Sequence, residues 1–240
     1  MKFALLVPAL CACTAGSALT REPRSQIDRP YTLPSGVDQW STGVVIALGM
    51  DDTVSGAFFR IPLQWEVSLS DDWGLLLGSA LGIEHQFFND GRQRLGAQLT
   101  FEPLFASDLG ALFAPSLGFG YRVRLSPRWA WNSGLTGSAG RWTGRPVWTW
   151  GVGAGTGPML QLTETMVLSA SATVFLGRTY LTLPGAPLAP SAALDLSGAL
   201  GAGWSLSRQW DLGVSVGYER RARSAGYHQI WGGVGIANTW

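Results

Sequence analysis

The sequence predicts an all-β protein: a single antiparallel, up-and-down β-barrel that spans a membrane, with ten strands and with twelve as the alternative count. Apolar residues recur at every second position in segment after segment from Trp40 onward. Only 14% of the residues are charged, while 32 are glycine and 12 are tryptophan. After the first twenty residues no segment has the about 18 to 20 consecutive apolar residues of a membrane-spanning helix. The spanning elements are therefore expected to be strands.

The first 18 residues predict an export signal. Lys2 is followed by an apolar run from Phe3 to Cys13 and then by small residues. The stretch Leu10-Cys11-Ala12-Cys13 resembles the lipobox of bacterial lipoproteins, which implies that Cys13 carries a lipid. Ordinary signal cleavage near Ala18 is the alternative, and both stay open. Because both cysteines lie in this segment, we expect no disulfide within the exported chain.

Two further regions follow the export signal. Residues 19–38 are polar, aperiodic and rich in proline, which predicts an extended linker without a site. Residues 39–240 are assigned to the barrel. Lys2 is the only lysine, so the rest of the chain carries 16 arginines against 16 acidic residues. A net charge near zero gives no basic surface for nucleic acid, which we exclude as a partner.

Eleven segments show the alternation of a strand. In residues 57–69, Phe59, Ile61 and Leu63 alternate with polar residues such as Arg60 and Gln64. The segments are longer than the about 5 to 6 residues typical of globular strands, and this length suits tilted strands that cross a bilayer. They are residues 40–50, 57–69, 73–87, 95–105, 109–125, 129–139, 147–162, 166–180, 192–206, 210–221 and 228–240.

Four connections share one pattern, which is an apolar residue, Ser or Thr, two turn residues, and then Trp or Met. They are SLSDDW at 68–73, RLSPRW at 124–129, QLTETM at 161–166 and SLSRQW at 205–210. Tryptophan favours the headgroup boundary while a short polar turn enters water. The other connections are longer and richer in Arg, Gly and Pro. A soluble β-sandwich or lipocalin-like barrel also alternates, but its solvent face would hold more charge.

A short-turn end, a long-loop end and an aromatic last residue together resemble bacterial outer-membrane β-barrels. The resemblance covers about residues 40–240 and implies the outer membrane as the location, with the short turns in the periplasm. It also implies that the barrel-assembly machinery recognises the last strand. The residues that would form this signal are Trp240, Ile236 and Val234.

The strand count has a parity problem, because bacterial single-chain barrels have an even number of strands and eleven segments are predicted. Three of them lie between the turns at Asp72 and Ser126, where an even number must lie if both turns are periplasmic. We assign residues 95–105, which contain Pro103, to an outer excursion. This assignment gives ten strands, and twelve is the alternative.

Charged residues of both signs fall on the inward-facing positions. Inside a narrow barrel they would pair across the lumen, fill it and stiffen it, because a buried unpaired charge is costly. The predicted network comprises Arg60, Glu66, Glu84, Arg122, Arg124, Asp195, Asp211, Glu219 and Arg221. It favours a non-enzymatic structural or surface-binding barrel, which we expect to be a monomer. A narrow pore for small solutes is the alternative reading of the same residues.

The sequence offers no convincing catalytic, metal or cofactor site. A lipid-modifying hydrolase, the second alternative, would need His228 as base with Ser224 and Glu219, but their spacing is poor. His85 is expected to face lipid near the outer rim. Arginines expected at the outer end could bind lipopolysaccharide phosphates or be solvated; they are Arg92, Arg94, Arg141, Arg145, Arg178, Arg220 and Arg223.

Overall fold

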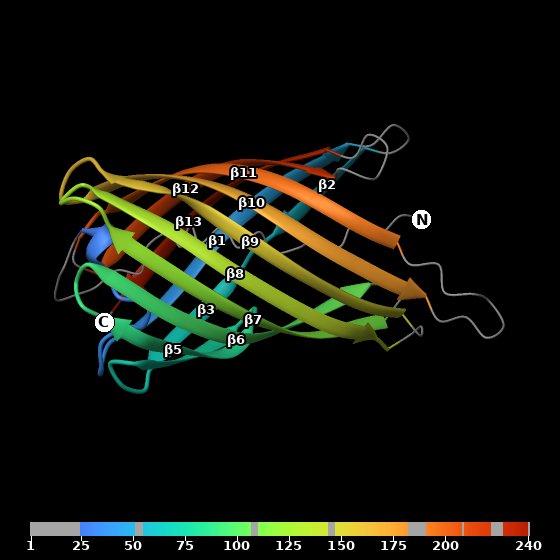
Figure 1. The fold of residues 1–240 in the computed structure, drawn as a ribbon, viewed down its shortest axis with the longest axis horizontal. Helices are drawn as coiled ribbons and strands as arrows, with labels where there is room; N and C mark the ends of the chain where they lie inside the picture. Colours follow the sequence, from blue (N-terminus) through green and yellow to red (C-terminus); the bar gives the residue numbers. More distant parts are fainter. Residues whose placement is uncertain are drawn as a thin grey trace.

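The protein forms a closed antiparallel β-barrel with a short segment of its own chain inside one end (Figure 1). The computed structural model describes residues 25–50, 55–106, 110–143, 147–181, 191–207, 209–221 and 228–239. Among them no helix is long and apolar enough to cross a membrane. The elements in chain order are η1 (Gln26–Asp28), β1 (Asp38–Met50), β2 (Ser55–Arg60), β3 (Leu63–Ser68), β4 (Trp73–Gly78), β5 (Leu81–Asn89), β6 (Gln93–Ala106), β7 (Gly110–Arg124), β8 (Trp129–Trp142), β9 (Val147–Gln161), β10 (Met166–Leu181), β11 (Ser191–Ser205), β12 (Trp210–Arg221) and β13 (His228–Thr239).

The first and last strands close the barrel. β1 pairs with β13 along its length, from Gln39 opposite Thr239 to Met50 opposite His228. β2 and β3 both pair with β1 in one register, on either side of Ile61 and Pro62. They are therefore two halves of one wall strand, interrupted where proline has no N–H to donate. Counted this way, the described residues form a barrel of twelve strands.

The prediction of ten strands is wrong, and the error lies in residues 73–87. This segment is not one strand but two, β4 and β5, joined by a tight turn at Ser79 and Ala80. The alternation hid the turn, because Leu77 before it and Leu81 after it are both exposed on the outer face. Residues 95–105 are not an outer excursion but belong to β6, which pairs with β5 on one side and β7 on the other.

A glycine makes the hidden turn sterically feasible. Gly78 has a φ of +133°, a backbone conformation that favours glycine. A Cβ atom there would lie 2.3 Å from the carbonyl oxygen of Leu63. With β4 and β5 counted separately, four strands lie between the turns at Asp72 and Ser126, as an even count requires.

The four turns predicted from their shared pattern have the same hydrogen bonding. In each, the apolar residue before the turn donates its N–H to the carbonyl oxygen of the Trp or Met that follows. The donors are Leu69, Leu125, Leu162 and Leu206, and the N–O distances are 2.8 to 2.9 Å. The turns lie at the end of the barrel where the last strand ends (Figure 1). By analogy with outer-membrane barrels we call this the periplasmic end.

The outer surface has the character expected of a surface in contact with lipid. Large apolar side chains are exposed on every wall strand, including Ile46, Leu99, Leu135 and Leu200. Tryptophans lie at the ends of strands near the periplasmic turns: Trp40, Trp65, Trp73, Trp129 and Trp210. Trp40 and Trp210 pack edge to face with ring centroids 5.8 Å apart. An apolar belt bordered by tryptophans is the surface of a membrane-spanning barrel.

Candidate functional site: a lumen closed by residues 25–37

Small side chains line most of the barrel interior. The inward positions of β9 between Thr149 and Met159 are all glycine, and their neighbours on β8 and β10 are mainly Ser, Thr and Gly. About eight strands give an interior just wide enough for side chains to fill it. Twelve strands enclose a wider interior, which is filled in part by the inward rings of Phe175 on β10, over Gly151 and Gly153, and Trp231 on β13, over Gly217.

The periplasmic end of this space is occupied by residues 25–37, which we call the plug. The plug contains η1 and precedes β1, and Figure 1 shows η1 inside the barrel near the short turns. Its residues Ile27, Arg29, Thr32 and Leu33 are at most 3% exposed. Residues of nine strands contact it, namely β3, β5, β6, β7, β8, β9, β10, β11 and β12. A segment that reaches nine of twelve strands must cross the lumen.

Three arginines on neighbouring strands bind η1 and the residue after it, two through main-chain carbonyls and one through the Asp28 side chain. Arg94 donates to the carbonyl oxygens of Ile27 and Asp28, both at 2.9 Å. Arg122 donates to the carbonyl oxygens of Gln26 and Arg29, both at 3.1 Å. Arg124 forms an ion pair of 2.8 Å with the Asp28 carboxylate. These bonds satisfy carbonyls that would otherwise be unpaired inside the barrel.

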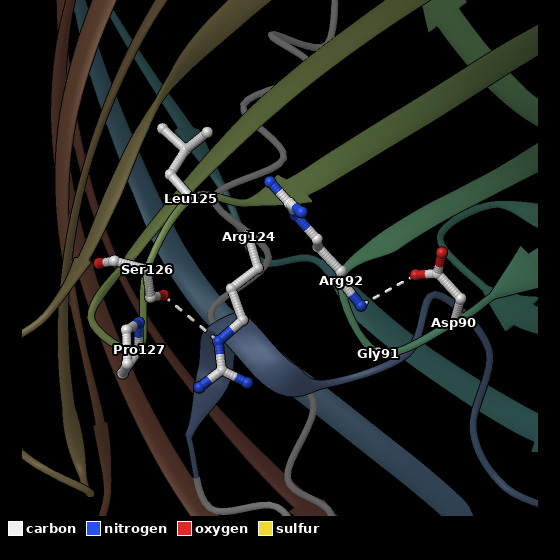
Figure 2. Close-up of a pocket in the computed structure, with 7 residues that line it drawn as sticks. All are labelled: Asp90, Gly91, Arg92, Arg124, Leu125, Ser126 and Pro127. Atoms are coloured by element: carbon white, nitrogen blue, oxygen red, sulfur yellow. Dashed lines mark hydrogen bonds between the residues drawn. The ribbon is translucent and has the colours of Figure 1, made fainter.

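Figure 2 shows how Arg124 reaches η1 from the end of β7. Its Nε donates to the carbonyl oxygen of Ser126, 3.3 Å away in the β7–β8 turn. Arg92 and Asp90 lie in the neighbouring β5–β6 turn, where the Arg92 amide donates to the Asp90 carboxylate at 2.9 Å. Both turns border a shallow pocket at the periplasmic rim.

The opposite side of the barrel holds the plug by a buried ion pair. Arg29 Nη1 lies 2.7 Å from the Asp211 carboxylate of β12, and Arg29 Nη2 donates to the Ser205 hydroxyl of β11 at 2.8 Å. The side chains of Arg29 and Asp211 are 4% and 0% exposed. An ion pair so shielded from water is costly to break on one side only.

The second half of the plug is bound by its amides. Tyr31 N–H donates to Gln86 Oε1 at 3.0 Å, and Leu33 N–H donates to Glu66 Oε1 at 3.2 Å. The Thr32 hydroxyl donates to the carbonyl oxygen of Asp71 at 2.7 Å. Residues on β3, β5 and the β3–β4 turn therefore replace the strand partners that this segment lacks.

Glycines provide room for the Tyr31 ring. A Cβ atom on Gly96 would lie 3.1 Å from the Tyr31 side chain, and one on Gly120 would lie 2.9 Å from its ring. The Arg122 guanidinium lies 5.5 Å from the ring centroid, within reach of a cation–π interaction. The ring thus occupies a slot between β6 and β7 that larger residues would close.

Burial raises the pKa of the Tyr31 phenol above its ordinary value, although Arg122 and Arg94 act in the opposite direction. A raised pKa means that the docked plug prefers the neutral phenol. The neutral Tyr31 phenol therefore stabilises the docked plug to its full extent at pH values below the ordinary tyrosine pKa of about 10. The contribution is lost as the pH rises through the higher, docked pKa.

We expect the tyrosinate absorbance of Tyr31 to appear only above the ordinary tyrosine range. The measurement is the difference between the alkaline titrations of the wild type and Tyr31→Phe, which isolates one phenol among five tyrosines. Titration of this phenol at or below the ordinary pKa would contradict a buried Tyr31.

The residues of the predicted charge network do not simply pair with one another across the lumen. Arg122, Arg124, Glu66 and Asp211 bind the plug. Arg60 forms an ion pair with Glu102, and Glu84 lies beside Glu66 on the inner face. Asp195 and Glu219 face inward farther from the plug, and Asp195 lies opposite Arg221 in the β11–β12 register.

Several residues singled out in the sequence lie elsewhere or outside the described residues. Cys13, Trp240, Arg145, Arg223 and Ser224 are outside them. Val234 is exposed on the outer face of β13, and Ile236, two positions on, lies on the same face with partial exposure. Arg92 and Arg94 lie at the periplasmic end rather than the outer end, because β5 and β6 are separate strands. Arg141, Arg178 and Arg220 do lie at the end of their strands opposite the short turns.

The two histidines show no catalytic arrangement in the part of the chain that the structure describes. His85 stacks on Trp73 at the periplasmic end, not at the outer rim as expected, and bonds to the carbonyl oxygen of Asp72. His228 forms a hydrogen bond with the Tyr218 hydroxyl on the outer face. Glu219, the expected partner of His228, faces inward.

Comparisons with known proteins agree with the barrel fold. An outer-membrane channel from Pseudomonas putida F1 superposes with a TM-score of 0.63 at 12% identity, covering 87% of this chain and 97% of that one. OmpT, an outer membrane protein of Vibrio cholerae, in a form lacking loop L8, gives 0.45 at 7% identity over 85% and 99%. The sequence matches no protein-family model and no curated protein. The closed barrel and its apolar belt, together with the likeness in fold to the channel from Pseudomonas putida F1, place the chain in the bacterial outer membrane.

Proposed function

We propose that the protein is an outer-membrane channel for small solutes whose periplasmic mouth is closed by its own plug. The observation that carries the proposal is the plug itself, which crosses the mouth and contacts nine strands. Beyond the plug, Gly, Ser and Thr line much of the lumen, and the large side chains of Phe175 and Trp231 also point inward, over Gly151, Gly153 and Gly217. A mouth closed by a separate segment, next to a lumen lined largely by small side chains, is the arrangement expected of a gated pore.

The likeness to the channel from Pseudomonas putida F1 shows a shared fold and contributes nothing more to this proposal. The proposal differs from the reading favoured by the sequence, in which charges fill the lumen. Many of these charges instead bind the plug near the periplasmic mouth. They are therefore available to hold a gate closed.

A non-enzymatic structural barrel is the second candidate. The buried Arg29–Asp211 pair favours it, because such a pair makes the plug hard to remove. A lipid-modifying hydrolase receives no support from the geometry, since Glu219 faces the lumen while His228 binds Tyr218 on the outer face.

Conductance in planar bilayers tests the channel. We expect the wild type to give no stable unitary steps, because the plug closes the mouth. Replacement of residues 26–33 by eight Gly and Ser residues keeps the chain length and should give stable steps. The matched control is Glu164→Gly in an exposed periplasmic turn, which should behave as the wild type. A folded Gly/Ser variant that stays silent would favour the structural barrel, and a fully conducting wild type would show that the plug does not close the pore.

A further inference from the structure

The barrel wall is incomplete beside β2. β3 pairs with β4 up to Gln64 opposite Gly78, and β5 pairs with β6 up to Leu81 opposite Phe101. From the tip of the β4–β5 hairpin toward the outer end of the barrel, β2 pairs only with β1. Over the same distance, residues 102–106 of β6 pair only with β7. Among the described residues, the facing edges of β2 and β6 therefore have no strand between them. We call this gap in the wall the window.

The size of the window follows from the strands it lacks. Nearer the periplasmic end, β4 and β5 lie between β3 and β6, so three inter-strand spacings separate β3 from β6. At about 4.8 Å each, the edges of the window lie roughly 14 Å apart, following the wall. The side chains of Arg60 and Glu102 bridge it as an ion pair, and they are 33% and 20% exposed.

The window opens at the depth of the apolar belt. Trp65 is one of the tryptophans near the periplasmic turns. Leu63 lies two residues closer to the outer end of the same strand, level with the hairpin tip. Ile61 and Phe59 follow on the same outer face, and each is 59% exposed. The unpaired edges therefore begin above the tryptophans, among side chains that contact hydrocarbon.

Unpaired strand edges are not stable when they face lipid. Each backbone N–H or C=O without a partner costs several kcal/mol there, so such edges occur only where they are buried in protein or line a water-filled space. The lumen behind the window can supply this water, because Gln64, Thr100 and Glu102 on its inner side are polar. The window thus has an apolar outer rim and a polar inner rim.

We propose that the window is a lateral binding site for a single-chain amphiphile, which enters from the membrane with its head in the lumen. The hydrocarbon chain would lie along Phe59, Ile61 and Leu81 on the outer rim. The head would hydrogen-bond beside Arg60 and Glu102 and to the backbone groups of the β2 and β6 edges. This inference rests on the strand pairing and not on the conductance proposed above.

Photolabelling in proteoliposomes tests the window. The probe is a palmitic acid that carries a diazirine next to its carboxylate, and the adducts are mapped by mass spectrometry of peptides. We expect adducts on the inward residues Gln64 and Thr100. The matched inward control is Thr136, on a wall strand with partners on both sides. It should remain unlabelled, while outward Leu135 and Leu200 are labelled as part of the belt.

A stapled variant separates entry through the window from entry through a mouth. Arg60→Cys with Glu102→Cys, joined by a bis-maleimide, should reduce the adducts on Gln64 and Thr100 to the level of Thr136. The isosteric pair Arg60→Gln with Glu102→Gln removes the ion pair without closing the window and should keep the labelling. Both cysteines of the chain lie in the predicted export signal, so no other thiol is expected to compete.

Three results of the labelling would overturn the window. They are the absence of adducts on Gln64 and Thr100, equal labelling of Thr136, and labelling that the staple leaves unchanged. Cross-links that join β2 of one copy to β6 of another would also overturn it, because a neighbouring chain would then cover the edges. If the Gly/Ser plug variant conducts while the labelling fails, the window is wrong and the channel stands; the reverse result rejects the channel alone.

Discussion

Asp211→Ala is expected to release the plug, and a cysteine introduced in place of Thr32 should then react far faster with a membrane-impermeant maleimide. The substitution leaves Arg29 buried without its carboxylate, at a cost of about 3 to 5 kcal/mol. Since about 1.4 kcal/mol is a factor of ten, the labelling rate should rise by roughly two to three and a half orders of magnitude. Thr32 is 2% exposed, so the docked state reacts slowly.

The control for this prediction removes both charges. Arg29→Met with Asp211→Leu leaves no unpaired charge, so its labelling rate should lie much closer to the wild type than that of Asp211→Ala. The substitution Glu164→Ala in an exposed turn should have no effect. Equal labelling rates in the wild type and Asp211→Ala would mean that the ion pair does not hold the plug.

Gly157→Ala is expected to prevent stable closure between β9 and β10. The added Cβ would lie 1.9 Å from the carbonyl oxygen of Ala170 and 2.8 Å from Ser171 Cα, which are backbone atoms. The register pairs stop at Ser169 opposite Met159 and resume at Ala172 opposite Thr156, so the two strands already depart from regular pairing here. Backbone atoms cannot rotate away, and we expect a loss at or above the upper end of the about 1 to 3 kcal/mol of overpacking.

The denaturant midpoint of the refolded barrel, read from its heat-dependent gel mobility, measures this loss. Gly137→Ala on β8 is the matched control, because the nearest atoms to its added Cβ are 3.9 Å away. It makes the same chemical change in open space and should leave the midpoint nearly unchanged. Equal midpoints for Gly157→Ala and the wild type would contradict the close approach of β9 and β10.

The barrel could be predicted from the sequence because each membrane-spanning strand must present apolar side chains to the lipid on one of its two faces. The alternation of side chains and the repeated Trp turns locate most wall strands to within a few residues. The β4–β5 hairpin escaped detection for the same reason, since Leu75, Leu77, Leu81 and Ile83 keep one phase across the turn. Only a glycine at position 78 and a serine after it mark the reversal.

The plug could not be predicted in the same way. Residues 25–37 have no period because they bind through main-chain carbonyls and amides, which every sequence possesses. The charges on the strands were visible, but their partners were not, and pairing with one another was the natural expectation. The signal that was present lies in the isolated apolar residues Ile27 and Leu33 and in Gly96 and Gly120, which leave space for Tyr31.

Amide hydrogen exchange of the plug in lipid bilayers tests the central claim most directly. The N–H groups of Ile27, Tyr31 and Leu33 donate to side chains of Gln161, Gln86 and Glu66, at 3.4, 3.0 and 3.2 Å. If residues 25–37 close the periplasmic mouth, these amides exchange far more slowly than in an unfolded chain, as part of one cooperative unit. Exchange of all three at the rate of an unstructured peptide would contradict the closed mouth and, with it, the gated channel.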